Sequence, residues 1–284
     1  MQYFAKYHGL GNDYLIVDGR ALASPPAPDK IRLLCDRHRG PGGDGLLVVA
    51  ASRGADFGVH IYNPDGSETE KSGNGLRILA RWLWDQGEVG SQPFTVDVLG
   101  GQERVLAQVH PGPPLRVTVD MGHASFRPLD VPTTLEGPEV VEVPLVLEGR
   151  TLKATAVGLG NPHCVFFPED ELDLAWLGPR VENHSAFPRR TNVQIARVLG
   201  PNQLAVTIWE RGAGITQASG SSACAAAAAA VRTGRMGGEV EVVMPGGILN
   251  VWIGKDFSIK QQGPVELVMV GQVGGETLER LSEP

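Results

Sequence analysis

Residues 59–63 (VHIYN) recur 147 positions later as residues 206–210 (VTIWE), and the same order of features follows each copy. A loop comes next, and then the dipeptide Ser-Gly, at residues 72–73 and again at residues 219–220. Each Ser-Gly opens a run that is typical of a helix, with apolar residues at helical spacing in the first copy and six consecutive alanines in the second. The chain therefore predicts the same strand, loop and helix twice.

A second pair of segments extends the repeat. Residues 9–12 (GLGN) recur as residues 158–161, and a strand-like run follows each. Strand-like runs outnumber the helix-like stretches, which are residues 28–37, 73–86 and 220–233. This ratio favours an α+β fold over a doubly wound parallel sheet. We expect two copies of one α+β unit, divided near residues 116–122, that face each other across a ligand-binding cleft.

The composition is that of a soluble globular protein. A length of 284 residues favours two domains, and 42% hydrophobic with 20% charged residues argues against a disordered chain. A net charge of −7 gives no basic surface for nucleic acid or for an anionic membrane. The three cysteines, Cys35, Cys164 and Cys224, suggest neither a disulfide scaffold nor a metal site. With no signal-peptide pattern and no apolar run of membrane-spanning length, we expect a cytoplasmic protein.

The starts of the two repeated helices are candidate binding sites. Ser72 and Ser219 stand where an N-cap residue stands, and capping alone would explain them. A helix that begins in a cleft also presents free backbone N–H groups and the positive end of its dipole, which bind a carboxylate or a phosphate.

Charged and amide side chains accompany these helix starts. Glu210 and Arg211 precede a glycine-rich turn, where they form either a structural salt bridge or a pair that binds an ammonium and a carboxylate. His163 is either a structural histidine or part of the site. Asparagines are common in turns, but four of them on one cleft would form an amide-lined site for an amino acid: Asn12, Asn63, Asn161 and Asn192.

Taken together, these motifs resemble the diaminopimelate epimerase family. The resemblance implies a fold of two pseudo-symmetric halves, each a β-sheet or barrel around a central helix, with the active site between them. We expect residues 1–118 to form one half, with residues 265–284 packed back on it, and residues 119–264 to form the other. The matching stretches follow the family order along nearly the whole chain: residues 8–13, 36–45, 63–75, 160–163, 190–193 and 210–224.

The resemblance also implies an activity and its residues. Such enzymes are homodimers that interconvert LL- and meso-diaminopimelate, on the route to lysine and peptidoglycan, with two bases on opposite faces of Cα and neither cofactor nor metal. Proton removal places negative charge on the adjoining carboxylate, which two helix N-termini would stabilise. By resemblance, the groups that bind this carboxylate are Gly73, Asn74, Gly220 and Ser221, and those that hold the rest of the substrate are Asn12, Asn63, Asn161, His163, Asn192, Glu210 and Arg211.

The two base positions depart from the family pattern. The family has cysteine at both, whereas this chain has Ser72 and Ser219. The pKa of a thiol is about 8.5 and falls to roughly 3.5–7.5 at a helix N-terminus, but a serine hydroxyl is far less acidic. We therefore expect an inactive or strongly impaired epimerase. Three interpretations are open: deliberate replacement of both cysteines, a natural homologue that binds an amino acid without turnover, or a racemase or dehydratase for another amino acid.

Overall fold

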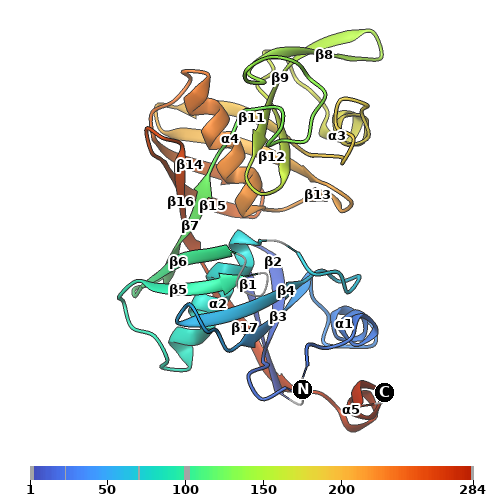
Figure 1. Cartoon of the computed structure of the whole chain (residues 1–284), viewed down its shortest axis with the longest axis vertical. Coiled ribbons are helices and arrows are strands. Elements are labelled where there is room, and N and C mark those ends of the chain that lie inside the picture. The colour runs from blue at the N-terminus through green and yellow to red at the C-terminus, as the bar shows by residue number, and fades with distance from the viewer. Residues whose placement is uncertain (1–2, 23, 70, 99–102, 283–284) are drawn as a thin grey trace. The chain divides into compact units, whose positions relative to one another are not determined.

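The computed structural model describes residues 3–22, 24–69, 71–98 and 103–282, so residues 1–2 and 283–284 of the expected domains lie outside it (Figure 1). The chain divides into two compact units. Unit 1 comprises residues 1–119 and 263–284, and unit 2 comprises residues 120–262. Both units mix strands with helices, so the α+β prediction is confirmed.

Unit 1 is built around seven strands and three helices among the described residues. They are β1 (Tyr3–Gly9), β2 (Asn12–Asp18), α1 (Pro28–Cys35), β3 (Gly45–Ala50), β4 (Phe57–Tyr62), α2 (Gly73–Asp85), β5 (Phe94–Val98), β6 (Glu103–His110), β17 (Glu266–Gln272) and α5 (Gly275–Ser282).

Unit 2 follows the same plan. Its elements are β8 (Val143–Leu147), β9 (Arg150–Gly158), β10 (Pro162–Phe166), α3 (Leu174–Glu182), β11 (Asn192–Gly200), β12 (Gln203–Glu210), β13 (Gly214–Thr216), α4 (Gly220–Arg232), β14 (Glu239–Met244) and β15 (Gly247–Ile253). Two further strands, β7 (Arg116–His123) and β16 (Ser258–Pro264), each contain one of the positions at which the chain passes between the units.

The strand pairings repeat in the same order. In unit 1, β1–β2 is antiparallel, β2–β3 parallel, β3–β4 antiparallel, β4–β5 parallel and β5–β6 antiparallel. In unit 2, the pairs β9–β10, β10–β11, β11–β12, β12–β14 and β14–β15 have the same sequence of directions. The helices α1 and α3 fill one equivalent connection, and α2 and α4 fill the other. The repeated unit inferred from residues 59–63 and 206–210 is therefore confirmed in the topology.

Each unit encloses one central helix. Helix α2 contacts β1, β2, β3 and β6, and α4 contacts β9 to β12, β14 and β15. In Figure 1, α4 lies among β11, β12, β14 and β15. Ala225 to Ala230 have no exposed surface, so α4 is buried on every side at its centre. The small alanine side chain allows strands to approach the helix closely from all directions.

The strand that completes each unit comes from a different place in the chain. In unit 2, β8 immediately precedes β9 in the sequence and pairs with it. In unit 1, β17 pairs with β1 from the far end of the sequence. This pairing explains why the C-terminal segment belongs to unit 1.

The predicted helices are present and end one or two residues earlier than expected, but two helices were not predicted. Helix α3 contains Gly178 and Pro179, which are typical of a turn. The glycine is required because a Cβ there would lie 2.4 Å from the Trp209 ring. Helix α5 is short and mostly exposed. No helix among the residues described is long and apolar enough to cross a membrane.

The packing around α4 yields a stability prediction. Ala227 is fully buried, and Ala227→Leu adds three carbon atoms to this closely packed position. We therefore expect it to lower the free energy of unfolding by about 1–3 kcal/mol. Ala175→Leu makes the same change on the exposed face of α3, in the same unit, and should alter it by less than about 0.5 kcal/mol. Urea denaturation followed by circular dichroism measures both. Equal effects would contradict the close packing of α4.

Candidate active site

Ser72 is the N-cap residue of α2. Its Oγ accepts a hydrogen bond from the backbone N–H of Gly75 at 3.0 Å, and the Tyr14 hydroxyl lies 3.4 Å away. The preceding residue, Lys71, forms an ion pair with Glu103 over 2.5 Å, so its ammonium is held by a carboxylate. Among the described residues, the contacts of Ser72 are therefore those of a structural cap, and none of them is with an evident general base.

Ser219 occupies the same position at the start of α4 but is bonded differently. Its side chain is buried and makes no capping hydrogen bond. The next residue is Gly220, and a Cβ there would lie 2.7 Å from Oε1 of Gln261, so a larger residue would require this side chain to shift. Ser219 therefore does not cap its helix through its side chain, whereas Ser72 does.

Both helix starts can bind an anion. Gly73 and Gly220 open the two helices, and neither helix has an acidic residue in its first turn. The positive ends of the two helix dipoles are therefore not offset by a carboxylate in the first turn of either helix. Each start can stabilise a carboxylate, and each would lower the pKa of a thiol placed at the N-cap.

The three cysteines do not replace the missing thiols. Burial, followed by the charges of Asp13 and Asp44, raises the pKa of Cys35 to about 12. Burial also raises the pKa of Cys164 well above its ordinary value. Cys224 is fully buried in α4, five positions beyond Ser219. All three thiols belong to the hydrophobic interior.

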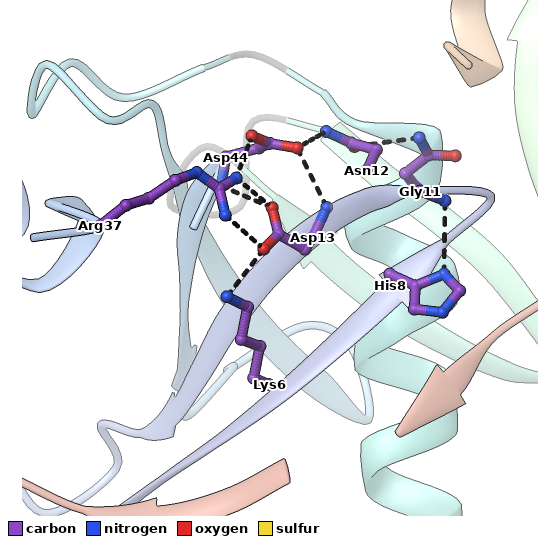
Figure 2. Close-up of polar contacts among 8 residues, drawn as sticks. Lys6, His8, Gly11, Asn12, Asp13, Arg37 and Asp44 are labelled. Atoms are coloured by element: carbon purple, nitrogen blue, oxygen red, sulfur yellow. Dashed lines mark hydrogen bonds and ion pairs between the residues drawn. The ribbon is translucent and has the colours of Figure 1, made fainter. Parts of the chain in front are cut away.

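A charged cluster in unit 1 holds the first GLGN turn (Figure 2). Asp13 lies between Lys6, at 2.8 Å, and Arg37, at 2.6 Å, and Arg37 also contacts Asp44 at 2.7 Å. Burial favours the protonated form of Asp13, but the bonds from Arg37 and Lys6 outweigh it and hold the pKa of this carboxyl well below its usual range. The second oxygen of Asp44 accepts from Nδ2 of Asn12 at 3.0 Å. The carboxylate thereby fixes which way the Asn12 amide faces.

The row of hydrogen bonds continues from the Asn12 amide to two side chains of α2. Oδ1 of Asn12 accepts from Nδ2 of Asn74 at 3.0 Å, and Oδ1 of Asn74 in turn accepts from the buried Arg77 guanidinium. Two of the predicted site residues, Asn12 and Asn74, are therefore in contact and have defined orientations. Asp13, Arg37 and Asp44 were not predicted as site residues, although all three lie within stretches that carry the family resemblance.

Unit 2 brings together another group of predicted residues. Asn192 donates to the carbonyl of Pro162 and accepts from the backbone N–H of Arg211, both at 2.9 Å. Its amide thus joins β10 to the loop that carries Glu210 and Arg211. The Arg211 side chain is exposed, and its Nη1 lies 3.3 Å from the Arg189 carbonyl. Glu182, which the sequence analysis missed, supports the loop by accepting from the backbone of Gly212 at 2.9 Å.

His163 and Asn161 form the last contact of this group. Nε2 of His163 lies 2.8 Å from Oδ1 of Asn161, and the imidazole is completely buried. Burial, with a smaller contribution from the charge of Arg211, lowers the pKa of His163 to about 3. The histidine is therefore uncharged near neutral pH and lies behind Asn161.

The remaining predicted residues make local contacts or are partly accessible. Asn63 donates to Ser67 Oγ at 3.0 Å within its own turn. Glu210 and Ser221 are half-buried. The structure thus groups Asn12 with Asn74 at the start of α2, and Asn161 with His163 and Asn192 with Arg211 in unit 2.

Curated relatives resemble this chain over nearly its whole length. A diaminopimelate epimerase of Desulfitobacterium hafniense is 42% identical over 271 residues, which cover 94% of this chain and 96% of the relative. One of a Synechococcus species is 44% identical over 279 residues, with the same coverage. 

Solved structures of lower identity show the same fold. A hydroxyproline epimerase of Agrobacterium vitis matches with a TM-score of 0.69 at 14% identity, covering 96% of this chain and 92% of the other. A PhzF-family phenazine biosynthesis protein of Bacillus anthracis matches with a TM-score of 0.67 at 16% identity, covering 96% and 99%. The family model described as diaminopimelate epimerase matches residues 4–127 and 155–271. On this match and the identity to curated relatives, the chain belongs to the diaminopimelate epimerase family.

Proposed function

We propose that this chain binds diaminopimelate as an epimerase does, and that serine at both base positions abolishes or strongly impairs turnover. The observation that carries the proposal is the pair of equivalent helices that begin after Ser72 and Ser219. Epimerisation requires one group to take the proton from Cα while a second group donates a proton to the opposite face. The substrate carboxylate gains negative charge in this step, and the N–H groups at a helix start stabilise that charge.

The serines supply the position of the bases but not their acidity. A cysteine at a helix start ionises near neutral pH and can take a proton, whereas a serine hydroxyl needs a neighbouring base to do so. Ser72 contacts a backbone N–H and a phenol, neither of which accepts a proton readily. A non-catalytic homologue that binds an amino acid is the second candidate function, and the same pair of serines favours it.

Restoring the thiols tests the proposal. We expect Ser72→Cys/Ser219→Cys to exchange the α-proton of diaminopimelate for deuterium and to interconvert its stereoisomers, because both bases regain an ionisable group. The parent chain should be slower by at least about 100-fold, the lower range of general acid–base effects. Proton NMR in D2O measures both rates.

Ligand-induced thermal stabilisation of the parent chain is the control for that experiment. A double variant that is folded and stabilised by diaminopimelate but exchanges no proton would favour the binding homologue. A parent chain that exchanges as fast as the double variant would contradict the impairment.

We propose that His163 supports Asn161 as a neutral imidazole and does not serve as an acid or base in the reaction. Its pKa of about 3 in the folded chain lies below the value of about 6.5 in an unfolded one, so the unfolded state binds the proton first as the pH falls. The stabilisation is complete above pH 6.5 and is lost as the pH falls from 6.5 toward 3.

The pH dependence of stability checks this assignment. Below pH 6.5, the free energy of unfolding of the parent should fall by about 1.4 kcal/mol per pH unit more than that of His163→Gln. Urea denaturation between pH 7.5 and 4.5 gives the difference. His123→Gln, which removes an exposed histidine from the same unit, controls for the loss of one histidine. Parallel curves for the parent and His163→Gln would contradict a neutral buried imidazole.

We propose that two copies associate through β17, in a reducing cytoplasm. The strand exposes four consecutive apolar side chains, Leu267 to Val270, with Val270 71% exposed. The equivalent strand β8 instead buries Leu145 and Leu147 in the core of unit 2. An apolar strand without such a cover fits a protein interface. The three free cysteines fit a compartment without disulfides.

A charge on this strand should separate the copies. We expect Val270→Lys to convert a dimer into a monomer, because the ammonium would be buried without a partner. Leu129→Lys, an apolar-to-lysine change at a 92% exposed position of unit 2, should leave the mass unchanged. Light scattering coupled to size-exclusion chromatography measures the mass. A dimer in both variants would place the interface elsewhere.

A further inference from the structure

Gln194 lies at the centre of a buried polar cluster and has no role in the function proposed above. It sits on β11, and its side chain has no exposed surface. Its Nε2 lies 3.1 Å from Nδ1 of His163 and 3.0 Å from Oγ of Ser222. Burying a polar amide costs free energy unless its groups are hydrogen-bonded.

The contact with Asn161 determines where the imidazole proton is. An amide oxygen only accepts, so Nε2 of His163 must donate to Oδ1 of Asn161 across 2.8 Å. A neutral imidazole has one N–H, and its other nitrogen is an acceptor. Nδ1 therefore accepts, and the amide of Gln194 is the donor that faces it. In the structure, donation therefore runs in one direction through the three side chains, from Gln194 through His163 to Asn161.

The opposite direction of donation is also chemically consistent, so the orientation of the Gln194 amide selects between the two directions. If its amide turned over, Oε1 would face Nδ1 and the proton would have to move to that nitrogen. Nε2 would become an acceptor, and Asn161 would have to turn its NH2 group toward it. The observed direction leaves Oε1 of Gln194 without a partner among the described residues. An unbonded buried acceptor is unfavourable, so the gain has to lie elsewhere in the cluster.

We propose that Gln194 is a positioning residue that sets this direction, so that Asn161 uses its oxygen on His163 and presents its NH2 group to a carboxylate oxygen of the bound amino acid. The inference rests on the proposed function, because it takes Asn161 as a substrate contact. The low pKa of His163 agrees with it, since a protonated imidazole would have no acceptor for the Gln194 amide. Through Ser222 the same amide also contacts the first turn of α4, three residues beyond Ser219.

The direction of donation can be read directly from the two ring nitrogens of His163. In the parent chain labelled with 15N-histidine, long-range NMR correlations should show a proton on Nε2 and none on Nδ1. Gln194→Glu replaces the donor by an acceptor and should move a proton onto Nδ1. Ser222→Ala removes the other bond of the same amide and should leave the ring unchanged. Gln194→Met removes the donor without adding charge, and serves if the glutamate variant does not fold.

Ligand binding tests whether the direction matters for the site. We expect Gln194→Glu to weaken the binding of meso-diaminopimelate by about 10- to 100-fold, because one hydrogen bond to a charged oxygen is lost. Gln194→Met should also weaken it, and Ser222→Ala should not. Isothermal titration of the otherwise unchanged chain measures all three.

The two readouts separate the possible failures. A proton on Nδ1 in the parent chain, or a ring unaffected by both Gln194 variants, would overturn the proposed direction of donation. Unchanged affinity in both Gln194 variants would overturn its role in the site. A parent chain that does not bind diaminopimelate would overturn the proposed function and the ligand contact of Asn161. The assignment of the ring protons needs no ligand and would still decide the direction of donation.

Discussion

The fold depends on burying a whole helix inside a layer of strands, once in each unit. Such a helix carries mostly small or apolar side chains, and the alanine run of α4 is the extreme case, whereas the buried Asn74 and Arg77 near the start of α2 are hydrogen-bonded to each other. Its first backbone N–H groups have no partner within the helix and must meet polar groups at its start. A central helix therefore confines polar chemistry to one end of each unit. Ser72, Ser219 and the glycines after them stand at those ends.

Duplication made much of the fold predictable from the sequence. The repeated Ser-Gly and GLGN segments predicted the central helices and a strand after each GLGN turn, and the strand pairings follow the same order in both units. The repeat also implies a helix in unit 2 equivalent to α1, which the local sequence pattern did not indicate. Helix α3 fills the same connection as α1, but Gly178 and Pro179 resemble a turn, and the close approach of Gly178 to the Trp209 ring is a tertiary contact that the sequence does not reveal. Local propensity was overridden there by tertiary contacts.

The site was predictable where a residue type demands a position. An N-cap serine, a glycine at the first turn and an asparagine in a tight turn follow from local backbone geometry. The residues that orient them do not. Asp44 reaches Asn12 across 32 positions of sequence, and Gln194 reaches His163 across 31. Gln194 also lies in a strand buried on both faces, so no alternation of polar and apolar residues marks its direction. The Asp44–Asn12 contact depends on how β2 and β3 pair, and the Gln194–His163 contact on the register of β10 and β11, neither of which the sequence states.

The two ways of completing a unit bear on how the chain folds as it is made. Unit 2 is one continuous segment, so all its strands are available once residue 262 has left the ribosome. Unit 1 begins earlier but lacks β17 until residue 272 has followed. During that interval the β1 edge that β17 will cover has unpaired backbone groups, a recognised template for wrong pairing between nascent chains. The half of the protein that is synthesised first is therefore the half that is completed last.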